Sequence, residues 1–130
     1  MDPPVRIFSS QCCVIDDGPQ YLRCVVGPGL PSLIQECYRN LAAECLNRQG
    51  KRILVVGASG GDSAVHLAGR DSMKAIALAG VPPGFRLAVV AATPDMVEVY
   101  DTAILEASSC GMQARRFGTE EQADAWLRAP

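Results

Sequence analysis

One short segment of the chain holds residues whose types and spacing fit three different chemistries. It runs from Ile53 to Leu67 and reads ILVVGASGGDSAVHL. The apolar first part is typical of a strand buried on both faces, and the glycine-rich part is typical of a turn that leads into a helix. The residues that could carry chemistry or hold a ligand are Gly57, Ser59, Gly60, Gly61, Asp62 and Ser63.

The first chemistry is hydrolysis. Residues 57–61 fit the pattern G-x-S-x-G, which in hydrolases places a nucleophilic serine, here Ser59, on a sharp turn between strand and helix. Such a serine needs a histidine base that follows later in the chain. The only histidine, His66, lies seven residues after Ser59 in the same segment. The missing base argues against a serine hydrolase, and we expect a protein that is not an enzyme.

The second chemistry is nucleotide binding. Gly57, Gly60 and Ser63 have the spacing of a dinucleotide-binding loop, in which glycines allow a tight turn and the close approach of pyrophosphate. Here Ser63 replaces the third glycine, and the next expected strand ends in Ala91 without an acidic residue for the ribose. A binder of a nucleotide or a small apolar ligand, through the loop from Gly57 to Ser63 or a gap between helices, therefore remains the alternative function.

The third chemistry is regulation by phosphate. Asp62 and Ser63 stand where a helix is expected to begin, and a phosphate on Ser63 would add almost two negative charges there. Asp and Ser are also preferred residues for capping a helix. Both interpretations stay open: Ser63 is a phosphoacceptor with Asp62 beside it, or the pair only starts the helix.

Composition narrows the class of protein. The chain has 130 residues, of which 48% are hydrophobic and 20% are charged, and its formal net charge is −2. This balance is typical of one folded domain spanning residues 1–130. Basic residues are scattered, with the pair Arg115-Arg116 read as a solvated strand end, so we expect no nucleic-acid partner. Without a long apolar run or a signal peptide, we expect no membrane contact and a cytoplasmic location.

Six cysteines are spread along the chain without a C-x-x-C motif. We expect reduced thiols, no metal site and no cofactor, because metal sites recruit clustered Cys and His and the chain has one histidine. Cys37 and Cys45 fall on the apolar stripe of an expected helix and are predicted to be core residues. Strand alternation predicts one of Cys12 and Cys13 facing inward and the other outward.

The pattern of apolar residues predicts an order of strand, strand, helix and then three strand-helix units. The helix after the glycine turn is expected to begin at Asp62-Ser63 or at Asp71-Ser72, and the last helix to begin with a capping box, TEEQ, at Thr119. The expected strands are 5–15, 21–26, 53–56, 86–91 and 112–117. This order predicts an α/β (α+β) domain, with a leading hairpin and a mostly parallel sheet of about five strands and four helices.

The element order, with Asp62-Ser63 following a central strand, resembles the SpoIIAA-like STAS domain family of bacterial anti-sigma-factor antagonists. Residues 82–91 and 123–127 are similar to the corresponding stretches of its uncharacterised bacterial members. The resemblance implies a non-enzymatic regulatory domain that acts by protein-protein contact. It also implies an anti-sigma factor or kinase as partner and Ser63 as the residue that the kinase phosphorylates. An edge hairpin further suggests a homodimer.

Overall fold

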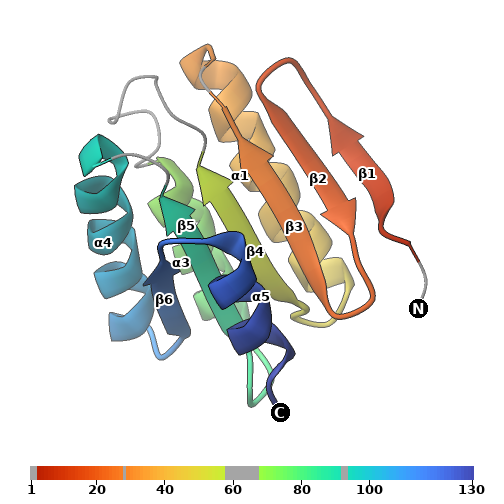
Figure 1. Ribbon diagram of the computed structural model, residues 1–130, viewed down its shortest axis with the longest axis vertical. Coiled ribbons are helices and arrows are strands. Elements are labelled where there is room, and N and C mark those ends of the chain that lie inside the picture. Colours follow the sequence, from red (N-terminus) through yellow and green to blue (C-terminus); the bar gives the residue numbers. More distant parts are fainter. Residues whose placement is uncertain (1–2, 28, 58–67, 92–93) are drawn as a thin grey trace.

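Six strands form one sheet within residues 3–27, 29–57, 68–91 and 94–130, which are the residues that the computed structural model describes. The strands follow one another across the sheet in the order of the sequence. Four helices in the same residues pack on its two faces (Figure 1). The elements are β1 (Val5–Ser9), β2 (Cys13–Asp17), β3 (Tyr21–Val26), α1 (Pro31–Asn47), β4 (Arg52–Gly57), α3 (Ala68–Ala79), β5 (Arg86–Ala91), α4 (Pro94–Ser109), β6 (Gln113–Phe117) and α5 (Glu120–Arg128).

The direction of the strands changes once along the sheet. β1, β2 and β3 pair antiparallel, whereas β3, β4, β5 and β6 pair parallel. Parallel neighbours need a crossover, and α1, the segment ending in α3, and α4 provide these connections. The sequence prediction of an α/β domain with an antiparallel start and a mostly parallel remainder is confirmed.

The prediction of a single strand over residues 5–15 is wrong. The chain reverses at residues 10–12, where the backbone N–H of Ser10 donates to the carbonyl of Cys13 at 2.8 Å. Polar residues at the reversal interrupt the apolar run, and β1 and β2 then pair antiparallel with a bulge between Arg6 and Phe8. The sheet therefore has one more strand than the five that we predicted, and β1 is its edge.

The two faces of the sheet are covered unequally. The larger core lies between the sheet and α1, α3 and α4, whereas α5 covers only the β4, β5 and β6 part of the other face (Figure 1). Alternation along the strands sorts side chains to the faces: Ile53 and Val55 belong to the larger core, and Leu54 packs under α5. On the second face, α5 reaches β3 only through side chains at its boundary, and no described helix packs closely on β1.

Two helix ends have the capping residues that the sequence predicted. The hydroxyl of Thr119 accepts a hydrogen bond from the backbone N–H of Gln122 at 3.2 Å, which caps α5. Gly111, after α4, has a φ of 89°, a left-handed conformation that glycine adopts without strain. α3 already includes Ala68, so the alternative start at Asp71-Ser72 is wrong. The alternative at Asp62-Ser63 lies outside the described residues.

Candidate functional site

The predicted loop leaves the sheet at the carboxyl end of its central strand. β4 ends at Gly57, which is level with Val26 of β3 and Ala91 of β5. Of the predicted site residues, Gly57 lies in the described part of the chain. Five others lie outside it, namely Ser59, Gly60, Gly61, Asp62 and Ser63, and so does His66. The structure thus places Gly57, the first residue of the predicted site, at the middle of the carboxyl edge of the sheet.

Gly57 is in close contact with an aromatic ring. A Cβ built on this glycine would lie 2.5 Å from the hydroxyl oxygen of Tyr100 and 2.6 Å from a ring carbon. Its φ is not among the positive values, so the requirement for glycine comes from space and not from backbone conformation. Tyr100, on α4, accounts for this glycine without a bound pyrophosphate.

A pair of tyrosines lies next to the carboxyl end of β4. The hydroxyls of Tyr38 on α1 and Tyr100 share a hydrogen bond, and both side chains are buried. Burial raises the pKa of Tyr100 to about 12 and the pKa of Tyr38 well above its ordinary value. Both phenols are therefore neutral near pH 7. The two rings contribute to the packing at this end of β4 and do not act as an acid-base pair at neutral pH.

The sheet order bears on the nucleotide alternative. In open α/β sheets, dinucleotides bind in the crevice where the strand order reverses. The described strands run in sequence from β1 to β6 without such a reversal. One hollow lined by described residues lies at the amino edge of the parallel strands. It has a volume of about 360 Å³ and is lined by Gly50, Arg52, Phe85 and Leu127, among others. The predicted loop at Gly57 is at the opposite edge.

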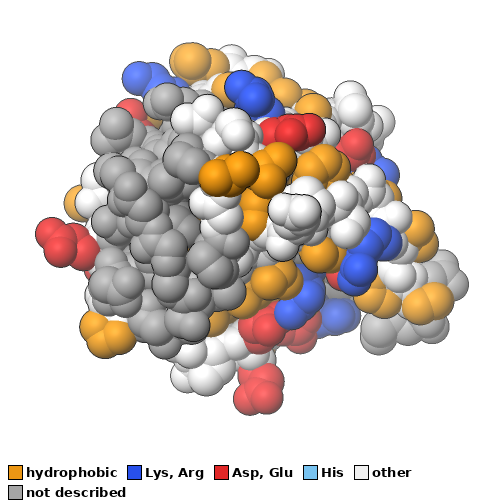
Figure 2. Space-filling view, turned by 90° about the horizontal axis from the view of Figure 1, so that it is seen from above, with side chains coloured by type: hydrophobic (Ala, Val, Ile, Leu, Met, Phe, Trp, Pro, Cys, Tyr) orange, Lys and Arg blue, Asp and Glu red, His pale blue; other side chains and the backbone are white. Residues whose placement is uncertain are grey.

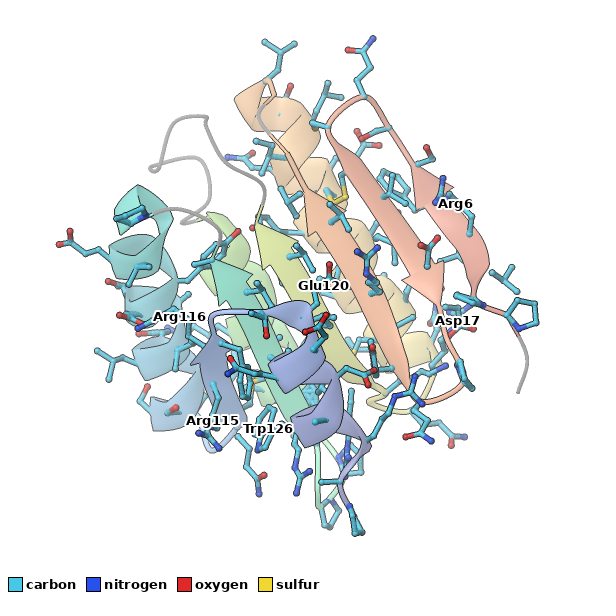
Figure 3. All side chains as sticks on the ribbon, viewed as in Figure 1. Arg6, Asp17, Arg115, Arg116, Glu120 and Trp126 are labelled. Carbon is cyan, nitrogen blue, oxygen red and sulfur yellow. A yellow bond between two sulfur atoms is a disulfide. The ribbon has the colours of Figure 1, made fainter. Side chains whose placement is uncertain are left out.

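The second face of the sheet carries a set of ion pairs at its boundary with α5. The guanidinium of Arg23 on β3 donates to both carboxylate oxygens of Glu120, at 2.8 and 3.0 Å. Glu120 is labelled on α5 in Figure 3. The hydroxyl of Tyr21 donates to Asp124, which also accepts from Arg128 at 2.7 Å. These contacts hold α5 against β3, and the face beyond them, over β1 and β2, carries the pair Arg6–Asp16.

Three buried cysteines meet between α1 and the β2–β3 hairpin. A disulfide joins Cys13 on β2 to Cys37 on α1, with their Cα atoms 6.1 Å apart (Figure 3). The sulfur of Cys24 on β3 lies 3.9 Å from that of Cys13 and 3.7 Å from that of Cys37. Our expectation that all six cysteines are reduced is wrong for this pair, because the hairpin and the helix bring Cys13 and Cys37 within bonding distance.

The sequence reasoning missed this cluster because it searched for short spacings. The signal that could have found it is the hairpin register: Ile15 pairs with Cys24, which puts Cys13 diagonally across from Cys24 on the same face. Cys37 and Cys45 are buried as predicted. The prediction that one of Cys12 and Cys13 faces outward is wrong, because both side chains are buried. Cys12 lies at the chain reversal and packs against Gly29.

Seen from above in Figure 2, the described surface around the carboxyl edge mixes hydrophobic side chains with charged ones of both signs. None of the helices in the described residues has the length and apolar character needed to cross a membrane.

Comparisons of this chain with protein-family models, with curated proteins and with solved structures found no match.

Proposed function

We propose that this protein is a regulatory protein-interaction domain of the SpoIIAA-like STAS type, whose switch is phosphorylation of Ser63. The observation that carries the proposal is the position of Gly57. It ends the central parallel strand at the carboxyl edge, six residues before Ser63, in a sheet whose strands and helices alternate in the order on which the family resemblance rests.

The packing around Gly57 supports a protein surface over a cofactor site. Tyr100 explains why position 57 is glycine, and the sequential strand order provides no reversal at which a dinucleotide would sit. Asp62 and Ser63 follow Gly57 by five and six residues in the sequence, and we propose that a partner recognises them at this edge. A phosphate there changes the local charge by close to two units, and it can alter binding without altering the fold.

The partner is a protein, which the resemblance identifies as an anti-sigma factor with kinase activity. The described surface at the carboxyl edge has apolar and charged side chains side by side, as non-obligate protein interfaces do. The partly uncovered second face over β1 and β2, with the exposed Val5 at its edge, is a second surface that a partner or another copy of the chain can use.

The test is incubation with ATP and an anti-sigma-factor kinase of the type that phosphorylates the family, followed by mass spectrometry of the modified peptide. We expect one phosphate on Ser63, its loss in Ser63→Ala and its retention in Ser59→Ala, which changes the same loop. Ser63→Asp should weaken binding to the kinase at least tenfold. Unmodified Ser63, with Ser63→Asp binding as the wild type does, would mean that Asp62 and Ser63 only cap a helix.

A further inference from the structure

The cluster of Cys13, Cys24 and Cys37 is separate from the proposed switch and has its own chemistry. Each of the three side chains is at most 2% exposed, so the sulfurs lie inside the larger core. All three sulfur atoms lie within 4.8 Å of one another. Three thiols at this distance can do more than form one disulfide, because the third sulfur, on Cys24, contacts both members of the bonded pair.

The position of Cys24 fits the geometry of a metal site. A bond between a d10 metal ion and a thiolate is about 2.3 Å long, so three sulfurs in a plane around one ion stand about 4 Å apart. Cys24 already lies 3.9 Å from Cys13 and 3.7 Å from Cys37. The Cys13–Cys37 bond must be reduced before the sulfurs of this pair can stand at the same distance.

We propose that, after reduction of the Cys13–Cys37 disulfide, Cys13, Cys24 and Cys37 bind one Cu(I) ion through their three sulfur atoms. A dithiol reductant breaks the disulfide and leaves two thiols, while the dithiol becomes a disulfide itself. Each sulfur that then bonds to the ion as a thiolate releases its proton to solvent. The oxidation state of copper does not change in this binding step.

The three cysteine sulfurs favour Cu(I) over other metal ions. Thiolates are soft ligands, which prefer soft ions such as Cu(I). Zinc in structural sites takes four ligands in a tetrahedron. Among the described residues, this cluster has three cysteines and includes no histidine or carboxylate. Cu(I) is satisfied by two or three thiolates, so it matches the set as it stands.

The three sulfurs lie among apolar side chains of the larger core, and such a hydrophobic shell limits the access of solvent to a bound ion. Cys13 pairs with Val26 at the end of the ladder, so the cluster lies close below the carboxyl edge, next to Cys12 and the chain reversal.

The experiment is an anaerobic titration of the reduced protein with Cu(I) in the presence of a coloured Cu(I) chelator as competitor. We expect one tightly bound ion per chain, with X-ray absorption showing three sulfur neighbours at about 2.3 Å. The oxidised protein should leave the ion with the chelator. Cys24→Ala and Cys37→Ala should each raise the Kd at least tenfold, whereas Cys45→Ala, a buried cysteine further along the same helix, should not change it.

A separate measurement keeps the variants interpretable. Cys24→Ala still contains Cys13 and Cys37, so correct folding is verified when its disulfide forms on oxidation and its circular dichroism matches the wild type. A Cys24→Ala protein that passes both checks and binds Cu(I) as tightly as the wild type overturns the proposal. Tighter binding of Zn²⁺ than of Cu(I), measured by the same competition, contradicts the assignment of the ion.

Discussion

Arg86 lies over the indole ring of Trp126 and also binds the backbone of the same residue. Its guanidinium carbon is 5.3 Å from the ring centre, and its Nη1 donates to the carbonyl of Trp126 at 2.6 Å and to that of Ala129 at 2.9 Å. Arg52 donates to Leu127 and Ala129 from the neighbouring strand. Two arginines thus satisfy the last carbonyls of α5 at the negative end of the helix dipole.

Replacing Arg86 should loosen α5 from the sheet. Arg86→Ala removes three charged hydrogen bonds, to the carbonyls of Trp126, Ala129 and Pro130, and a stacked cation. We expect the free energy of unfolding to fall by about 2–3 kcal/mol in a urea titration. Arg86→Lys keeps the charge but not the planar fork, so it should recover only part of this loss. Arg115→Ala is the control: Arg115 is exposed and stacks on Phe117 and Trp126. An equal loss in both alanine variants would contradict the capping role.

Gly57→Ala should destabilise the protein even without any ligand. The new methyl group would lie 2.5 Å from the Tyr100 hydroxyl, in a buried region where the ring must move, and we expect a loss of about 1–3 kcal/mol. Tyr100→Phe removes the nearest atom but leaves the ring carbon at 2.6 Å, so the double variant should regain part of the stability. Urea titrations of the four proteins form a double-mutant cycle. Additive losses would show that Tyr100 is not the reason for glycine.

Features that depend on a few adjacent residues could be predicted from the sequence. The cap at Thr119, the left-handed Gly111 and the buried run of β4 each follow from local rules, and the structure has all three. The strand boundary at residues 10–12 could not, because two short strands and one long strand show nearly the same apolar pattern. Only the pairing of Val5 with Asp17 distinguishes them, and pairing is a long-range property.

In the candidate sites, too, local features could be predicted from the sequence and long-range contacts could not. The glycines predict a loop after Gly57, but the reason for glycine at position 57 lies with Tyr100, which is 43 residues later in the chain. The cysteine cluster was missed because its members come from two strands and a helix, and only the register and the crossover bring them together. Spacing rules find sites that are built from one segment. They do not find sites that are built by packing.

Asp17 should make the stability depend on pH. Burial alone would raise the pKa of Asp17, but the hydrogen bonds and charges of Lys51 and Arg48 outweigh it and hold the pKa below 3.8. A lowered folded-state pKa means that the ionised group stabilises the fold above the pKa of the unfolded chain, about 3.9. This contribution is lost as the pH falls through the lower, folded-state value.

Asp17→Asn should therefore cost stability at pH 7, and this cost should shrink as the pH falls through the folded-state pKa, where the wild-type carboxylate becomes protonated too. We expect a difference of about 0.5–1 kcal/mol at pH 7, since the ion pair is partly exposed to solvent. Urea titrations of both proteins from pH 7 to pH 2.5 measure it. A difference that is constant over this range would mean that Asp17 contributes through packing and not through its charge.

The Cys13–Cys37 disulfide should contribute strongly to stability because it ties α1 to the hairpin. It links residues 24 positions apart, and closing a loop of this length in the unfolded chain corresponds to about 3–4 kcal/mol. Dithiothreitol should lower the free energy of unfolding of the oxidised protein by up to this amount. The double variant Cys13→Ala, Cys37→Ala should be insensitive to the reductant, although its core has lost two sulfurs. If dithiothreitol destabilises both proteins equally, the bond is not the source of the effect.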